Sequence, residues 1–217
     1  MTRRVVLNLC SLATLLLLSG CFTGKRPHLN NDPFAAGTPT GDVAIDAVLE
    51  KLDAVTSGPA TAIYSVLTKF GDTTTSATVV LDGDQRAIEV GTTRFLQAGG
   101  QEFTCTIDAT TGASVDCSIG FNAARISDVG ITTEFYAAEA ATRLRRDAQA
   151  RLADAVASEE VIANQDATCA AVSLNGGIAT YCVLTNGMIA KLDDGDVLIT
   201  VGLLVPTVDA VKLRPPT

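Results

Sequence analysis

The sequence predicts an α+β protein in which short antiparallel strands are interrupted by helical segments. Two observations support this fold class. Short segments rich in Val, Ile, Thr and Phe recur between turn residues, which is typical of an antiparallel meander. Residues 42–55 and 121–157 instead carry apolar side chains at helical spacing, so we expect a helix in each.

The chain begins with the pattern of a secretory leader. A basic pair, Arg3-Arg4, precedes an apolar stretch over residues 5–18, and small residues follow. The stretch has 14 residues, whereas a helix needs about 20 to span a bilayer. The leader suits both the general secretory and the twin-arginine export routes, and the sequence does not separate them.

The last residues of this leader, Leu18-Ser19-Gly20-Cys21, resemble the lipobox of bacterial lipoproteins. In that family the lipobox Cys carries a diacylglycerol and becomes the mature N-terminus. The resemblance implies a signal peptide over residues 1–20, lipidation at Cys21, and a membrane anchor on the extracytoplasmic face of the cell membrane. The alternative is an ordinary secretory signal that a cysteine follows by chance.

Residues 21–41 are predicted to be the lipidated N-terminus and a disordered tether, because Pro, Gly, Asn and Thr dominate without an apolar period. The only histidine of the chain, His28, lies there and is interpreted as solvated. Residues 42–217 are predicted to form a single domain. Loss of the leader leaves 14 basic and 24 acidic residues, a net charge of −10, which argues against nucleic-acid binding.

The first predicted helix begins at Asp42, an N-cap, and ends before Gly58-Pro59. Strands are expected over Thr61–Phe70, Ser76–Leu81, Arg86–Val90, Thr93–Gln97, Glu102–Ile107 and Ser114–Cys117, then over Val161–Asn164, Thr168–Leu174, Ile178–Leu184, Met188–Leu192, Val197–Leu204 and Val208–Leu213. Between the two runs lies the predicted helix 121–157.

That second helix carries a thin apolar stripe, made by Phe135, Ala140, Leu144, Ala148 and Leu152. Its charges form two favourable i,i+4 pairs, Glu139 with Arg143 and Asp147 with Arg151. Arg143, Arg145, Arg146 and Arg151 suggest either an anion site or a solvated face, and we favour the solvated face.

Two hairpins predict the disulfides. If Asn175-Gly176 forms a two-residue turn, Cys169 lies opposite Cys182, at a spacing that a disulfide tolerates. A three-residue loop at Thr110-Thr111-Gly112 likewise places Cys105 opposite Cys117, although in a less certain register. A zinc site is the rival, but the four cysteines have no CxxC spacing and no nearby histidine.

Candidate catalytic and metal sites are weak. With its one histidine in the tether, the predicted domain has no base for a Ser-His-Asp or Cys-His set. Glu159-Glu160 on a strand would point to opposite faces, and Asp193-Asp194-Gly195-Asp196 lacks the spacing of known calcium loops, so a hairpin turn is favoured. We therefore predict neither an enzyme nor a metal or other cofactor.

The order of elements resembles the half-barrel lipoprotein family of LolA, LprG and LppX over about residues 42–214. The stretches 170–172, 181–182 and 186–190 add to the resemblance, since they are similar to paired strands of small actinobacterial lipoproteins of this type. The resemblance implies a single curved antiparallel sheet of about 10–12 short strands, with helices packed on its concave face. A cavity there would hold a lipid or glycolipid, whereas small Ala side chains would equally permit a closed core.

Two functions follow from this resemblance. The first is a membrane-anchored lipoprotein that binds a lipid or another hydrophobic molecule between sheet and helices. The alternative is a non-catalytic interaction or sensor module of the cell envelope with a filled core. The sequence assigns no ligand-binding residue and identifies no protein partner.

Overall fold

The computed structural model describes residues 32–54, 58–122, 124–125 and 137–215. Pro33–Thr217 forms one compact unit. The predicted signal peptide, Cys21 and residues 22–31 of the predicted tether lie outside the described residues. So do residues 126–136 of the second predicted helix.

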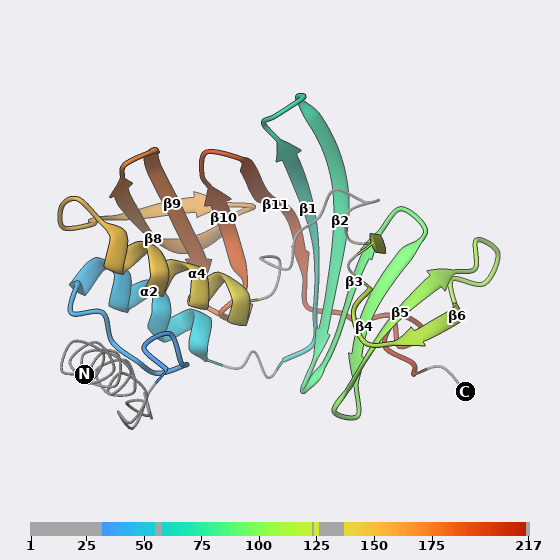
Figure 1. The fold of residues 1–217 in the computed structure, drawn as a ribbon. Helices are drawn as coiled ribbons and strands as arrows, with labels where there is room; N and C mark the ends of the chain where they lie inside the picture. Colours follow the sequence, from blue (N-terminus) through green and yellow to red (C-terminus); the bar gives the residue numbers. More distant parts are fainter. Residues whose placement is uncertain (1–31, 55–57, 123, 126–136, 216–217) are drawn as a thin grey trace, which may run out of the picture. The chain divides into compact units, whose positions relative to one another are not determined.

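Eleven strands form one open, curved antiparallel sheet (Figure 1), in the order β6-β5-β4-β3-β2-β1-β11-β10-β9-β8-β7. The strands are β1 (Ala60–Thr68), β2 (Thr73–Asp82), β3 (Gln85–Val90), β4 (Thr93–Ala98), β5 (Gln101–Ile107), β6 (Ser114–Ile119), β7 (Val156–Ile162), β8 (Gln165–Leu174), β9 (Gly177–Leu184), β10 (Ile189–Asp193) and β11 (Val197–Val205). Two consecutive meanders, β1–β6 and β7–β11, are joined side by side through β1 and β11.

The last predicted strand, Val208–Leu213, is wrong. Pro206 ends β11, and the following residues form a turn in which the backbone N–H of Lys212 donates to the Asp209 carbonyl at 3.0 Å. Leu213 then enters a second apolar cluster, whose other buried members are Val80, Ala87, Leu96, Ala98, Phe103 and Cys105. Lys212 pairs with Glu89, which also pairs with the buried Arg94. The segment thus covers the sheet with side chains instead of extending it.

The first helix, α2 (Val43–Asp53), follows the prediction closely. The second, α4 (Ala137–Ala150), ends earlier than the predicted residue 157. Residues 156–162 form β7 instead, because pairing with β8 from Val156↔Ala171 to Ile162↔Gln165 outweighs the local helix propensity of Ala and Glu. Leu152, predicted in the apolar stripe, consequently lies beyond the helix and is 69% exposed.

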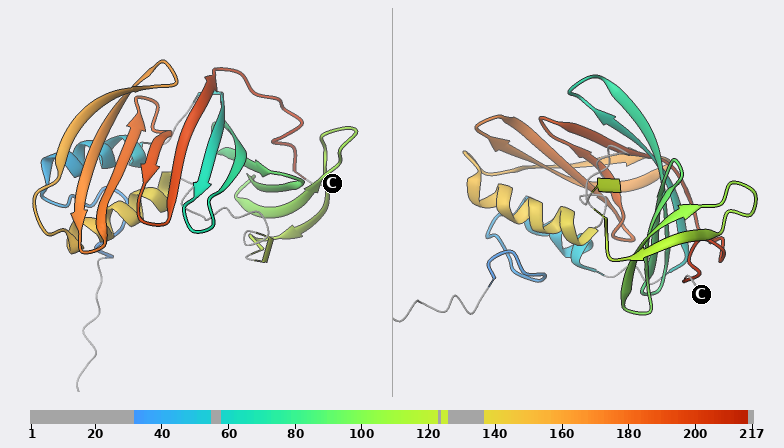
Figure 2. Two further views of the ribbon diagram at one scale, coloured as in Figure 1. Left: turned by 90° about the horizontal axis from the view of Figure 1, so that it is seen from above. Right: turned by 45° about the vertical axis from the view of Figure 1, so that its right-hand side comes forward.

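The two helices lie side by side on the concave face of the sheet and contact its β7–β9 end (Figure 2). Their facing side chains are fully buried in one core with the strands: Ala44, Ile45, Val48, Leu49 and Leu52 from α2, and Ala140, Ala141, Leu144 and Ala148 from α4. Among the described residues, the small alanines therefore permit close packing of the helices on this end of the sheet.

Both predicted disulfides are present. Cys169 bonds to Cys182, with Cα atoms 4.1 Å apart, in the register that Leu174↔Gly177 sets. Cys105 bonds to Cys117 in a less regular hairpin. There Thr104 faces Ser118 but Thr106 faces Val115, so β6 carries one extra residue. Asp116 absorbs it at a positive φ of 49°.

The segment 33–41, predicted as tether, lies against the helices. The backbone N–H of Gly37 donates to Asp53 at 2.9 Å, and that of Thr40 donates to Asp46 at 2.7 Å. The guanidinium of Arg146 lies 5.5 Å from the ring centre of Phe34. The compact unit therefore includes residues 33–41, which were predicted as tether, because charged side chains of α2 and α4 bind this segment.

We predict that the double variant C169A/C182A lowers the free energy of unfolding by about 3 kcal/mol, the chain-entropy value for a loop of this length. Urea denaturation would measure the change, and mapping of non-reduced peptides would verify both pairings. C105A/C117A removes a bond that closes a loop of similar separation, 12 against 13 residues, so it provides the matched comparison. A loss well below 1 kcal/mol in both would contradict a stabilising role.

Asp42 should make stability depend on pH. Burial alone would raise the pKa of its carboxyl, but hydrogen bonds from the N–H groups of Ala155, Ile45 and Ala44, with the charge of Arg151, hold the pKa below 3.8. Its stabilisation is therefore full above pH 3.8 and declines as the pH falls through the lower folded-state pKa. Relative to D42N, which retains a good N-cap, the wild type should lose stability below about pH 4. A difference that stays constant from pH 7 to pH 3 would contradict this.

Candidate functional site

The four arginines of the second predicted helix hold the fold together. Arg143 pairs with Asp194, Arg145 with Asp53, and Arg151 with Asp42 at 3.4 Å. Arg145 is only 2% exposed and also donates to the Thr38 carbonyl at 3.0 Å. This corrects the favoured solvated face for Arg145 and gives no support to the anion site, because three of these cations already have carboxylate partners.

The acidic turn between β10 and β11 is a hairpin turn, as predicted. The Asp194 carboxylate accepts from the backbone N–H groups of Asp196 at 2.6 Å and Val197 at 2.8 Å. Its other oxygen meets Arg143, while Lys69 binds Asp193 at 2.7 Å. The carboxylates of Asp193 and Asp194 are thus committed to amides and cations of the protein.

Glu159 and Glu160 do point to opposite faces of β7. Glu159 accepts from the Thr168 hydroxyl at 2.9 Å. Glu160 lies 3.9 Å from the Lys191 ammonium and near the sulfur atoms of Cys169 and Cys182. Because these sulfurs form a disulfide, they supply no thiolate ligand to a metal.

Two buried tyrosines make polar contacts in the core. The Tyr181 hydroxyl donates to Asp147 of α4 at 2.6 Å, and the Tyr64 hydroxyl donates to the carbonyl of Ile189 at 2.8 Å. Burial raises the pKa of both phenols well above the ordinary value, with the Asp147 charge adding to the effect at Tyr181. Both therefore act as neutral donors, and Tyr64 fixes the start of β10 against β1.

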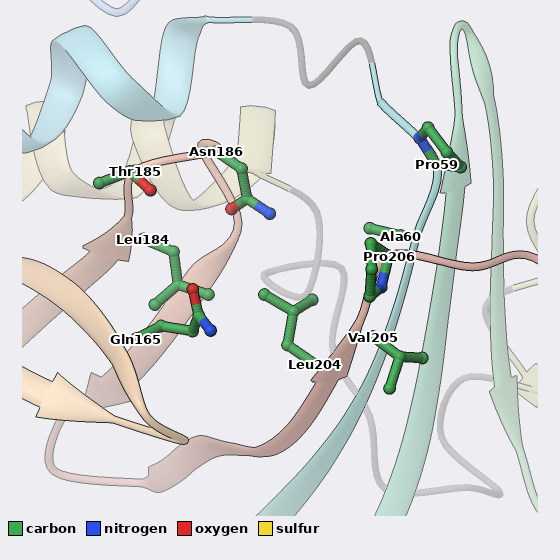
Figure 3. A pocket seen from close by; sticks show the side chains of 9 residues that line it. All are labelled: Pro59, Ala60, Gln165, Leu184, Thr185, Asn186, Leu204, Val205 and Pro206. Atoms are coloured by element: carbon green, nitrogen blue, oxygen red, sulfur yellow. The ribbon is translucent and has the colours of Figure 1, made fainter.

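A pocket of about 280 Å³ lies beside that start of β10. Figure 3 shows its lining, which comes from the ends of four strands and one turn: Pro59, Ala60, Gln165, Leu184, Thr185, Asn186, Leu204, Val205 and Pro206. Ala60 and Leu184 are buried, whereas Gln165 and Thr185 are exposed. The pocket thus has an apolar floor and a partly polar rim.

The pocket forms because β10 is shorter than its neighbours. Its register with β11 runs only from Asp193↔Leu198 to Lys191↔Thr200, and β11 continues to Val205 against β1. A bulge between Ile189 and Lys191 shifts the register of β10 with β9. The ends of β9 and β11 are therefore separated by a turn instead of a strand.

The lining determines what this pocket can hold. Six of its nine residues are apolar, and none is ionisable. Its volume of about 280 Å³ lies just below the roughly 300–1,000 Å³ that small-molecule pockets occupy. The pocket suits a neutral apolar group about as large as one side chain or a short alkyl segment.

Sequence reasoning assigned no ligand residue, and the expected cavity lay between helices and sheet. The described pocket lies at the ends of β9 and β11, beside the turn at Asn186. The available local signal was the Asn186-Gly187 turn before the predicted strand 188–192. The position of the opposite wall of the pocket, the end of β11, depends on its pairing with the distant strand β1.

The chain matches no protein-family model and no curated protein sequence. Among solved structures it is similar to a chain of the MucA/MucB complex of Pseudomonas aeruginosa, with 11% identity and a TM-score of 0.47, covering 80% of this chain and 61% of that one. MucB in complex with MucA(peri) gives 12% identity, a TM-score of 0.42, and coverage of 80% and 62%. The chain thus spans about three fifths of the length of these two matches.

A LolA superfamily protein from Nitrosomonas europaea gives 10% identity and a TM-score of 0.29, covering 81% of this chain and 96% of that one. Among the described residues, no helix is long and apolar enough to cross a membrane.

We predict that Tyr64→Phe lowers the free energy of unfolding by about 1–3 kcal/mol, because the buried Ile189 carbonyl loses its phenol donor. Urea denaturation would measure the loss. Ser65→Ala, at the exposed neighbouring position, is the control and should have little effect. Equal stabilities of the Tyr64 and Ser65 variants would contradict a role of this contact in holding β10.

Proposed function

We propose that this protein is a lipid-anchored binding protein of the extracytoplasmic membrane face, and that it binds a neutral apolar group of its ligand in the pocket between β9 and β11. The leader and its Cys21 support the anchor. The single observation that carries binding is the pocket, which combines a buried apolar floor with an exposed rim.

The acyl chains of a modified Cys21 would supply the membrane affinity, at about 0.8 kcal/mol per buried CH₂. Two disulfides in the domain agree with export, because such bonds persist in oxidising compartments. The mature net charge of −10 disfavours direct adhesion to an anionic leaflet. The anchor, rather than the domain surface, would therefore hold the protein at the membrane.

The second candidate is an envelope interaction module. The observation in its favour is the filled contact of α2 and α4 with the sheet, where nine facing apolar side chains are buried. Such a core leaves binding to the ends and edges of the sheet. Both candidates are non-catalytic. They differ in the ligand: the first binds an apolar molecule in the pocket, and the second binds another protein of the envelope.

The anchor is tested by fractionating cells that express Cys21→Ser. We expect the protein to move from the membrane to the soluble fraction and to lose incorporation of labelled palmitate. Cys10→Ser is the matched control, because it alters a cysteine inside the predicted leader, and it should remain in the membrane. Unchanged membrane association of Cys21→Ser would refute the anchor.

Binding is tested with decanol as a neutral apolar probe, added to the Cys21→Ser protein. Titration should shift the methyl NMR signals of Leu184, Leu204 and Val205. Adding Leu204→Trp, which fills the pocket, should weaken binding at least tenfold. Leu203→Trp, at an adjacent position that does not line the pocket, is the matched control. Binding that Leu204→Trp leaves unchanged would exclude this pocket.

A further inference from the structure

The end of β11 has one free side, like an edge strand, although β11 lies in the middle of the sheet. Leu203, Leu204 and Val205 pair with Ile63, Ala62 and Thr61 of β1 on one side. On the other side, the register with β10 stops at Thr200. Within the described residues, this end of β11 therefore has a strand partner on one side only.

Such a backbone can accept another strand. Unpaired N–H and C=O groups along an extended edge are a template for pairing with a further chain. Gly202 is exposed, Leu203 is 49% exposed, and Leu204 and Val205 are half-buried. Water has access to this edge, so an incoming polypeptide would have access as well.

The two outer edges of the sheet are protected, and a bulge also marks the start of this inner edge. The edge strand β7 carries Glu159 and Glu160, and the edge strand β6 is distorted by the bulge at Asp116. Charged side chains and bulges both discourage strand addition. Gly202 is the extra residue of the bulge at the inner edge, since Ile63 faces Leu203 but Tyr64 faces Val201. The three residues beyond it, Leu203-Leu204-Val205, have neither charge nor proline, and Pro206 only ends them.

We propose that an extended polypeptide segment of a partner protein adds to β11 alongside Gly202–Val205 and places one apolar side chain in the adjacent pocket. This inference rests on the proposed binding function and names the class of its ligand. Main-chain hydrogen bonds would supply affinity, and the pocket would supply specificity, as in other cases of strand addition.

The pocket also defines the segment. Its 280 Å³ is large enough for one large aliphatic or aromatic side chain. No lining residue is ionisable, so the inserted side chain is neutral. The amide side chains of Gln165 and Asn186 stand at the rim (Figure 3), where polar neighbours of the inserted residue would lie.

The test uses the mature-length Cys21→Ser protein and the peptide Thr-Val-Thr-Leu-Thr-Val-Thr. Two matched peptides have the same side chains but are N-methylated at alternate amides, one at the odd-numbered and the other at the even-numbered residues. Each therefore lacks the N–H donors along one of its two edges. We expect the parent peptide to bind and one N-methylated peptide to bind at least tenfold more weakly. Hydrogen exchange should show new protection of amides in Gly202–Val205 on binding.

The outcomes separate the two proposals. Decanol binding that Leu204→Trp weakens, without peptide binding, would leave the proposed function intact and overturn strand addition. Peptide binding that neither pattern of N-methylation weakens would also overturn it, because backbone pairing would then be irrelevant. If neither probe binds, both proposals fail. Loss of peptide binding in Leu204→Trp but not in Ile178→Trp, at an exposed position outside both the pocket and Gly202–Val205, would support the pocket as the specificity element.

Discussion

The pairing of β1 with β11 is the constraint on which the rest of the structure depends. Within each meander, neighbouring strands are joined by short turns, so their pairing is local. Only β1 and β11, about 140 residues apart, join the meanders into one sheet, at the entropic cost of closing a long loop. Side chains reinforce this seam: Tyr64 binds the backbone of β10, and Lys69 binds the turn that precedes β11.

What the sequence predicted correctly was local. Asn175-Gly176 specifies a tight turn, and the turn alone sets Cys169 opposite Cys182. Asp42 caps α2 with its own side chain. The errors arose where a distant partner decides the structure. Residues 156 and 157 left the predicted helix because β8 was available for pairing, and segment 33–41 lies against the helices because Arg145 and Arg146 bind it.

The pocket could not be predicted for the same reason. Its two walls come from the turn at Asn186 and from the end of β11, and their separation depends on the bulge in β10 and on the register of β11 with β1. No pattern within either segment reports that separation. The family resemblance directed attention to the helix–sheet interface, where the described side chains instead form a filled core.

An alkyl chain and a polypeptide would both bury apolar surface in this pocket, at about 25 cal/mol per Å². They differ in their effect on the adjacent backbone of β11. Water hydrates its free N–H and C=O groups in the unbound protein, and an alkyl chain lying over them would remove that water without replacing its hydrogen bonds. A buried unpaired group costs about 1–3 kcal/mol. A strand both covers and pairs these groups, so the edge favours a polypeptide even though the pocket accepts either ligand.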